Sequence, residues 1–582
     1  MRKIWKVLSV TAAVIAAACT FTACVKEDPR ARGKISITYW GEVGLSNRDV
    51  LEELVDTYNE TNEDNVYVNL VPQSTGYSQS LSTTLKGQNP PDVVMIDDRY
   101  FKGYVNNDYL EPLDSYIESS SLDIDDIWPS TIERFRYNPE TGYSGGDNPQ
   151  YALPDGNTPT LIYYNADMFS DQNVAVISVA EGDLAAYNEA NETSFLPHGY
   201  YAYTSDPTGG NLTPRNDGLY HVFNNQIAMS WEELRECSRI FTKEFNSSSA
   251  SRYGFMNEWW FSYGWSVGGD CLEWSDDLDQ YIFALGEDVP NYLVTGDEPV
   301  TVNGTEYHEG ELLSYADKHY VADHLEAADI AGYIQSERLY EFPSIYDAFL
   351  EFCRLSQTTD REVTTGKKGY GISPSPTTLS QKGKNLYFTS GELAMLVQGA
   401  SESYTIGRQL ANSGVAWDVA PCNQYREFNE DGTLKYVNGT PVVGRKAAHN
   451  GSKGYAIPKN SKKKSAAWKF IEYMVGTEAQ TKLIEANIAV PNQMSLAYSD
   501  TYMKSDVDYS PSNKAALVDA AAYGTVGDWS YVEDGEWING WADVLNTSVR
   551  DGNMTLDEYF QSAAVKQTNE ILKKYTARKF NG

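Results

Sequence analysis

The chain has 582 residues, 41% of them hydrophobic and 22% charged, which is enough for about two to four globular domains and excludes a mainly disordered chain. Its formal net charge of -35 disfavours nucleic acid and anionic lipid as partners, because both are negatively charged. Aromatic residues make up 13% of the chain, mostly Tyr and Trp, whose polar tips suit wet binding sites as well as cores.

The N-terminus has the pattern of a bacterial secretion signal. A positively charged start precedes the apolar run from Val7 to Ala18, which is too short to span a bilayer. The next residues, FTAC, resemble a lipobox, so Cys24 is the expected lipidation site and Cys19 the alternative. An ordinary signal peptide with an incidental cysteine stays open. We expect residues 1–23 to be the signal peptide and residues 24–33 a tether that holds the protein at the extracellular face of the cytoplasmic membrane.

The first elements after the tether alternate between strand and helix. Residues 34–40 and 66–71 alternate in polarity as strands do, and residues 48–62 carry apolar side chains at helical spacing. The segment PPDVVMID, residues 90–97, contains a continuous apolar run after its two prolines, which is typical of a strand buried on both faces. This order predicts an α/β domain with a mostly parallel sheet.

The later chain continues the same alternation. We expect a strand at 160–164 and an amphipathic helix around Phe470, and capping boxes at Ser230 with Glu233 and at Thr555 with Glu558 predict two helix starts. The segments 172–225 and 271–340 have weak periodicity and are interpreted as insertions. The widely spaced Cys237, Cys271, Cys353 and Cys422 are most simply small buried hydrophobic residues, and disulfides among them stay open.

Six segments, taken in order, resemble the extracellular solute-binding proteins of ABC importers, in particular the maltose-binding-protein-like sugar-binding family 1. They are PPDVVMIDD, YALPDGNTPTLIYYNADMF, SWEELRECSRIFTKE, FTSGELAMLVQGA, YAIPKNSKKKSAAWKFIEYM, and EAQ followed by VPN. The resemblance implies a type II periplasmic-binding-protein-like fold: two α/β lobes, each a mostly parallel sheet flanked by helices, with a ligand cleft between them. The first lobe would comprise residues 34–155 with about 390–450, and the second residues 156–389 with about 451–582.

The resemblance also implies the protein's partners. These are an oligosaccharide ligand, the permease subunits of an ABC transporter, and the membrane through the lipid, with the protein itself a monomer. No cofactor, metal or catalytic residue is expected, although a structural calcium ion stays open. The low Lys plus Arg content, 46 against 81 acidic residues, argues mildly against a strongly anionic ligand.

Candidate ligand-binding residues lie where predicted strands end, because ligands of α/β lobes bind at the carboxyl ends of strands. Aromatic platforms bury the flat faces of sugars, and carboxylates, amides and Arg bind their hydroxyl groups. The candidates are Trp40, Glu42, Asp97, Asp98, Arg99, Asn157, Glu258, Trp259 and Trp260.

The family resemblance bears on some of these candidates and adds two more. It implies that Asp98 with Arg99 contact hydroxyl groups and that Glu258 pairs with a stacking Trp260, and it adds Trp541, with Trp537 nearby. Adjacent residues of a strand point to opposite faces, so Trp260 is favoured over Trp259.

Two rival functions remain open from the sequence. A secreted glycoside hydrolase would share the aromatic and acidic composition, but it needs two carboxylates at a set separation across a glycosidic bond. A carbohydrate-binding surface or sensor protein of the same fold is the second rival. The identity, length and linkage of the sugar and the surface that contacts the permease are not readable from the sequence.

Overall fold

The computed structural model describes residues 28–42, 48–73, 76–275, 278, 280–525, 532 and 536–574. The expected signal peptide and both candidate lipidation cysteines lie outside these residues. Within them, no helix combines the length and apolar character needed to cross a bilayer. The described cysteines, Cys237, Cys271, Cys353 and Cys422, are free and buried.

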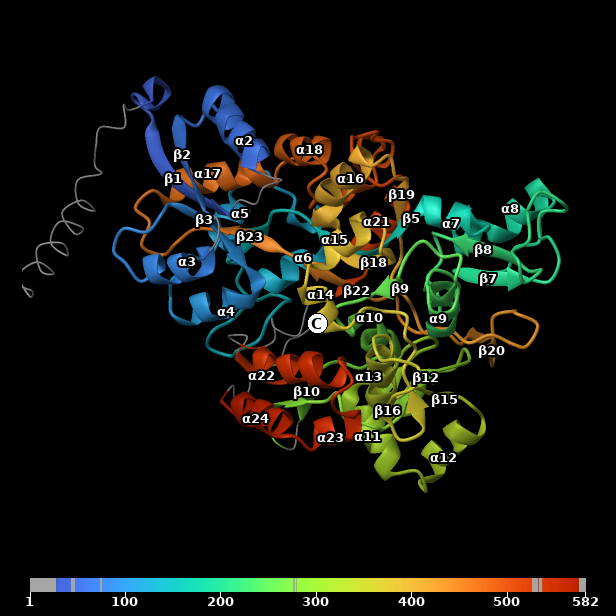
Figure 1. Ribbon diagram of the computed structural model, residues 1–582. Coiled ribbons are helices and arrows are strands. Elements are labelled where there is room, and N and C mark those ends of the chain that lie inside the picture. Colours follow the sequence, from blue (N-terminus) through green and yellow to red (C-terminus); the bar gives the residue numbers. More distant parts are fainter. Residues whose placement is uncertain are drawn as a thin grey trace, which may run out of the picture.

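The first lobe is built on a five-stranded sheet in the order β2-β1-β3-β23-β4 (Figure 1). Its strands are β1 (Ile35–Glu42), β2 (Val66–Gln73), β3 (Val93–Asp97), β4 (Ala152–Pro154) and β23 (Lys453–Ala456). The pairs β1–β2 and β1–β3 are parallel, and β23 runs antiparallel to β3 and β4.

Both faces of this sheet are covered by helices. In β3, Val93 and Met95 belong to one buried cluster, which also contains residues of α2 (Arg48–Thr61) and α17 (Lys464–Val475). Val94 and Ile96 point to the opposite face and pack with α3 (Tyr77–Leu85) and α4 (Asp98–Asn106). The strand can therefore be apolar at successive positions, because each of its two faces meets a helical layer.

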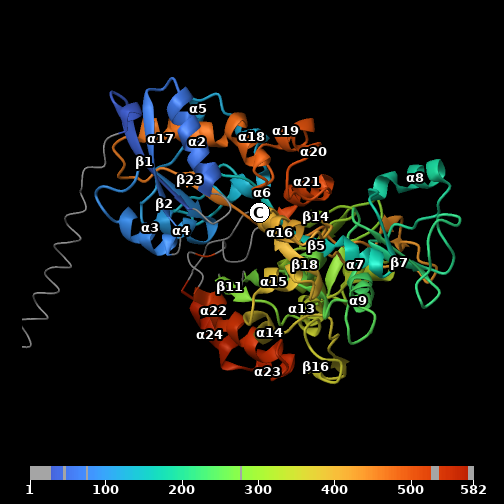
Figure 2. The same cartoon turned by 45° about the horizontal axis from the view of Figure 1, so that its top comes forward.

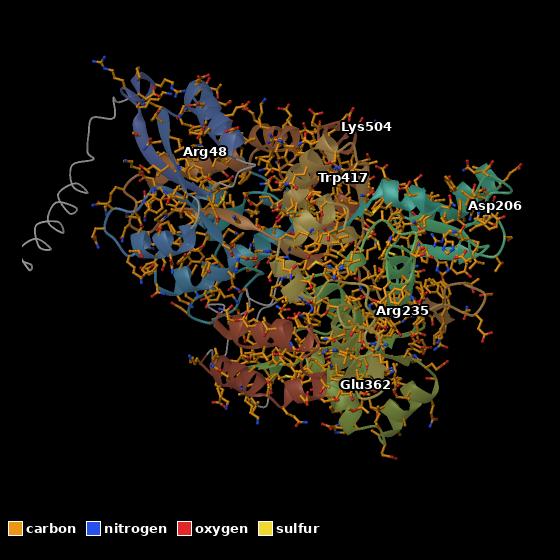
Figure 3. The ribbon with its side chains drawn as sticks, in the orientation of Figure 1. Arg48, Asp206, Arg235, Glu362, Trp417 and Lys504 are labelled. Atoms are coloured by element: carbon orange, nitrogen blue, oxygen red, sulfur yellow. The ribbon has the colours of Figure 1, made fainter. Side chains whose placement is uncertain are left out.

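The second lobe contains a sheet in the order β24-β22-β5-β18-β9, with β19 also paired to β5. The strands are β5 (Thr158–Asn165), β9 (Tyr253–Met256), β18 (Leu393–Gly399), β19 (Trp417–Ala420), β22 (Ala448–Gly451) and β24 (Gly524–Thr525). Helices α9 (Trp231–Ile240) and α13 (Ile345–Arg354) share a core with one face, and α16 (Ser403–Asn412) and α21 (Lys514–Ala522) share a core with the other. Trp417 of β19, on the α16 side in Figure 3, stacks on Tyr163 of β5 at 5.5 Å.

The pairing of the late strands corrects the expected lobe boundaries. Residues 390–450 were expected in the first lobe, but β18 and β22 both pair with β5 of the second. The chain from 451 on was expected in the second lobe, but β23 pairs with β3 and β4, and α17 packs on the first sheet. The assignment is wrong for these elements because an apolar strand pattern does not say which strand it will pair with.

Each expected insertion forms additional structure on the second lobe. In 172–225, a three-stranded sheet of β6 (Val174–Ile177), β8 (Tyr220–Asn224) and β7 (Tyr200–Tyr203) and helix α8 (Leu184–Asn191) project from the molecule (Figures 1 and 2). The region 271–340 forms three two-stranded pairs and two helices: β10 (Leu272–Ser275) with β11 (Gln280–Phe283), β12 (Asn291–Val294) with β15 (Leu339–Phe342), β13 (Val300–Val302) with β14 (Thr305–Tyr307), and α11 (Tyr315–Asp323) and α12 (Ala328–Gln335).

The C-terminal helices pack against the structure formed by the region 271–340 of the second lobe. They are α22 (Glu536–Val544), α23 (Leu556–Phe560) and α24 (Ala563–Leu572). Both predicted capping boxes are confirmed, at Ser230 and at Thr555, although Thr555 starts the short α23 and a second helix follows it. Asn569 Oδ1 accepts a hydrogen bond from the backbone N–H of Phe283, which joins α24 to β11.

Candidate functional site: a cleft between the two lobes

Two adjoining pockets open between the two main sheets. Their volumes are about 260 Å³ and about 230 Å³, and they share Thr158, Ser401, His449 and Gly451 as lining residues. Thr158 begins β5 and Gly451 ends β22, immediately beside two of the three places where the chain passes from one lobe to the other; the third lies between α18 (Thr477–Glu485) and α21. The two pockets therefore form one continuous cleft at the crossing between the lobes.

Polar strand ends form the first-lobe wall of the cleft. Glu42 ends β1, and its carboxylate forms an ion pair of 2.7 Å with Lys453, which begins β23. Asp97 ends β3 and caps α4 by accepting a hydrogen bond from the backbone N–H of Arg99. Burial raises the pKa of Asp155 to about 6, and the nearby Lys453 offsets part of that rise. This wall presents carboxylates on which a polyhydroxyl ligand can form hydrogen bonds.

Asp98 joins the cleft to the lobe crossing through a buried ion pair. Its side chain is 6% exposed and lies 2.8 Å from Nη1 of Arg134, which is fully buried. The same Nη1 donates to the carbonyl oxygen of Asn450, on β22 of the second sheet, at 2.7 Å. Burial raises the pKa of Asp98 to about 6, against the opposing charge of Arg134. One guanidinium therefore holds a cleft carboxylate and the strand that leads into the crossing.

The second-lobe wall carries the aromatic platform. Trp259 is half-buried, lines the cleft and stacks on Phe261, with ring centroids 5.8 Å apart and planes 14° apart. Phe261 also stacks against His449 at 5.5 Å. The side chain of Glu258 is exposed and forms an ion pair with Lys384. An indole face beside charged groups is the combination that binds the flat face and the hydroxyl rim of a sugar ring.

The platform is supported from below by the C-terminal helices. Trp541 of α22 meets the ring of Trp259 nearly edge-on, at 6.5 Å and 70°. Arg550, which follows α22, donates from Nη1 to the carbonyl oxygen of Glu258 at 3.1 Å. The last helices thereby position residues that lie almost three hundred positions earlier in the chain.

Six of the predicted ligand-binding residues line this cleft, on both of its walls. They are Glu42, Asp97, Asp98, Arg99, Glu258 and Trp259.

The preference for Trp260 over Trp259 is wrong in this structure. β9 ends at Met256 and α10 (Phe261–Gly264) follows, so strand alternation no longer governs the two indoles. Trp260 is 1% exposed and packs in the core against Phe349, at 6.3 Å, while Trp259 lies in the cleft wall. Gly264 makes room for it, because a Cβ there would meet the indole ring at a forbidden distance.

The other predicted residues lie outside the cleft lining. Trp537 and Trp541 are buried in the large second-lobe core because α22 turns them inward. Trp40 packs against the α3–α4 side of the first lobe. Asn157 is fully buried in the crossing, where its side-chain N–H donates to the carbonyl oxygen of Ala521 at 3.2 Å. Of these residues, Trp541 contacts the cleft wall, through its edge-on packing against Trp259.

Several cleft residues were missed by the sequence reasoning. They are Asp155, Lys384, Ser401, His449 and Lys453. A signal was present for Lys453, because it begins a strand that directly follows a crossing between the lobes, but recognising it required the correct strand pairing. Burial lowers the pKa of His449 to about 3, so the imidazole is neutral at ordinary pH. Among the described residues, no cluster of His, Cys, Asp and Glu is suited to hold a metal ion.

Solved structures of solute-binding proteins share this architecture. An ABC substrate-binding protein of Listeria monocytogenes in complex with cycloalternan superposes with a TM-score of 0.54 at 17% identity, covering 93% of this chain and 98% of that one. The GacH receptor of Streptomyces glaucescens gives 0.54 at 14% identity, covering 93% and 100%. The sugar-binding protein MalE of Xanthomonas citri gives 0.52 at 15% identity, covering 93% and 98%. At these identities the likeness establishes the fold, and it confirms the predicted two-lobe architecture.

Sequence comparison gives the family. No curated protein matches this chain. The family model for bacterial extracellular solute-binding proteins matches residues 53–221 and 363–511, which together are more than half of the chain. These matched residues include strands of both sheets and most of the cleft. The chain therefore belongs to the bacterial extracellular solute-binding protein family.

Proposed function

We propose that this protein captures an oligosaccharide in the cleft between its lobes and delivers it to an ABC permease. The family is one of binding proteins, not enzymes. The observation that carries the sugar assignment is the stacked Trp259–Phe261 platform, which faces a wall of carboxylates across the same cleft. Aromatic faces bury the C–H surfaces of a sugar, and carboxylates accept hydrogen bonds from its hydroxyl groups.

The ligands of proteins with the same fold support this proposal. The protein of Arthrobacter globiformis binds cyclic α-maltosyl-1,6-maltose, the Listeria monocytogenes protein was solved with cycloalternan, and the GacH receptor was solved with acarbose. Cyclic α-maltosyl-1,6-maltose is built from a maltosyl and a maltose unit and therefore contains more than one sugar ring. A cleft made of two adjoining pockets provides length for more than one ring.

Delivery requires capture and release without a chemical step. We propose that the lobes close on the ligand by bending at the crossings between them, two of which lie near Asn157 and Ser452, and that the closed form is the one that the permease recognises. Lipid on Cys24, or on Cys19, would hold the protein at the outer face of the membrane and raise its concentration near the permease. In this role the protein acts as a monomer.

Calorimetry with a panel of neutral and acidic oligosaccharides, a peptide and a polyamine tests the assignment. We expect at least one oligosaccharide to bind, to quench or shift the tryptophan fluorescence, and to be recovered unchanged. Binding of the peptide or polyamine without any sugar would refute the sugar assignment. Cleavage of a bound glycan during the experiment would instead identify a hydrolase.

A further inference from the structure

The cations that line the cleft are already neutralised by carboxylates of the protein. On the first-lobe wall, Lys453 pairs with Glu42 at 2.7 Å, and Arg99 pairs with Asp97 at 3.4 Å. On the second-lobe wall, Lys384 pairs with Glu258. These pairs lie on both walls of the cleft, so on each wall the lining cations are paired with carboxylates of the protein.

The described acidic residues of the cleft outnumber its described cations by one when the buried Arg134 that pairs with Asp98 is included. Its described acidic lining residues are Glu42, Asp97, Asp98, Asp155 and Glu258, and its described lining cations are Arg99, Lys384 and Lys453. The neutral His449 does not change this balance. Arg134, behind the wall, is engaged by Asp98 and by the carbonyl oxygen of Asn450.

The internal segments outside the described residues cannot supply a missing cation. They are 43–47, 74–75, 276–277, 279, 526–531 and 533–535, and their sequences contain no Lys or Arg. This charge balance is that of the described lining residues and Arg134.

We propose that the cleft selects uncharged glycans over acidic ones, and that Glu42 and Glu258 determine this selectivity by occupying Lys453 and Lys384. The proposal rests on the proposed sugar-binding function and specifies its ligand class. A uronate carboxylate or a sulfate group in the cleft would have to displace Glu42 or Glu258 from its lysine, and would lie close to like charges in a partly desolvated site. A neutral hydroxyl group accepts and donates hydrogen bonds without that repulsion.

The first test compares neutral and acidic glycans on the full-length protein. Malto-, cello-, xylo- and galacto-oligosaccharides form the neutral set, and oligogalacturonates, oligoalginates and sulfated oligosaccharides form the acidic set. We expect the best neutral ligand to bind at least about tenfold more tightly than any acidic one. An acidic glycan as the tightest ligand would overturn the proposal and leave sugar binding intact, whereas no binding by either set would overturn sugar binding itself.

The second test removes the carboxylates that pair with Lys384 and Lys453. We expect Glu258→Gln and Glu42→Gln each to raise the affinity for the acidic set by about tenfold at low salt, with the gain fading at higher ionic strength. Lys384→Gln should instead weaken acidic ligands further. Asp500→Asn is the matched control, because it removes the same charge from an exposed pair. Asp500 begins α20 (Asp500–Met503), and its partner Lys504, labelled at the periphery in Figure 3, directly follows that helix.

Folding of each variant is checked by its thermal transition. Unchanged affinity for acidic glycans in folded Glu258→Gln and Glu42→Gln, or an equal gain in Asp500→Asn, would show that these pairs do not determine selectivity.

Discussion

The buried guanidinium of Arg550 donates from Nη2 to the backbone oxygen of Asn257 at 3.0 Å, so the C-terminal region holds the turn that carries the aromatic platform. The same side chain lies over the ring of Phe352 at 4.5 Å and donates hydrogen bonds to the two consecutive carbonyl groups that follow the end of β9. Those carbonyl groups directly precede Trp259. The position of the cleft's stacking residue therefore depends on an interaction between segments far apart in the sequence.

Replacing Arg550 should damage both stability and binding. Arg550→Met leaves the carbonyl oxygens of Asn257 and Glu258 without these donors, and we expect a loss of about 2–5 kcal/mol in the free energy of unfolding. Sugar affinity at a temperature where the variant is folded should fall at least about tenfold. Arg550→Lys, which keeps a donor, should recover part of both losses. Binding of Arg550→Met at the wild-type affinity would show that the turn holds its shape without this residue.

The two adjacent tryptophans should give opposite results. Trp259→Ala removes the cleft platform, and we expect sugar affinity to fall by about tenfold or more while the thermal transition changes little. Trp260→Ala removes a core side chain, and we expect a loss of about 3–5 kcal/mol in stability. Urea unfolding and calorimetry on each variant measure the two effects. If Trp260→Ala were stable and defective in binding, the roles assigned to these residues would be reversed.

Substitutions of Asp98 and Arg134 should have non-additive effects on the free energy of unfolding, because the two side chains form a buried ion pair. Arg134→Met leaves the carboxylate of Asp98 buried without this partner, and we expect it to cost about 3–5 kcal/mol. Adding Asp98→Asn removes that buried charge and should restore part of the stability, so the two effects are not additive. A double-mutant cycle in urea measures the coupling energy. If the two losses of stability simply added, Arg134 would stabilise the fold chiefly through its hydrogen bonds to the carbonyl oxygens of Ser130 and Asn450.

The stability of the ligand-free protein should depend on the protonation of Asp155. Burial raises its pKa from the ordinary 3.8 to about 6, so the folded protein retains a proton that the unfolded chain releases. The stabilisation is complete below about pH 4 and is lost as the pH rises through about 6. Wild type should therefore lose stability relative to Asp155→Asn between these values.

Urea unfolding of both proteins from acidic to neutral pH measures that difference. Asp500→Asn, at an exposed position, serves as the control for the loss of one carboxyl group. A difference between wild type and Asp155→Asn that stays constant with pH would contradict the prediction.

Local patterns identified many elements correctly. The apolar run at β3 was expected to be buried on both faces, and Val93 and Val94 indeed lie in different cores. The capping pairs at Ser230 and Thr555 begin helices as predicted. Such signals are readable because the interactions they describe join residues a few positions apart.

The site was predictable only in part, for the same reason. Glu42 and Asp97 end strands, and the rule that places ligands at strand ends brought both to the cleft. The rule failed for Trp260, where β9 had already ended and a helical turn had begun. It could not find Lys384 or Ser401, whose place in the cleft comes from packing between distant segments.

The sequence by itself determined the α/β alternation, the family resemblance and the strand ends on which a ligand site could be built. Tertiary structure alone decided that β18 and β22 join the second sheet while β23 joins the first, because strand pairing depends on hydrogen bonds and burial between remote segments. It also decided that Trp259 lines the cleft while Trp260 fills the core. Because β9 ends at Met256, no strand period applies to these two residues, and their packed neighbours decide instead: Trp260 packs against Phe349, and Trp259 meets Trp541 in the cleft wall.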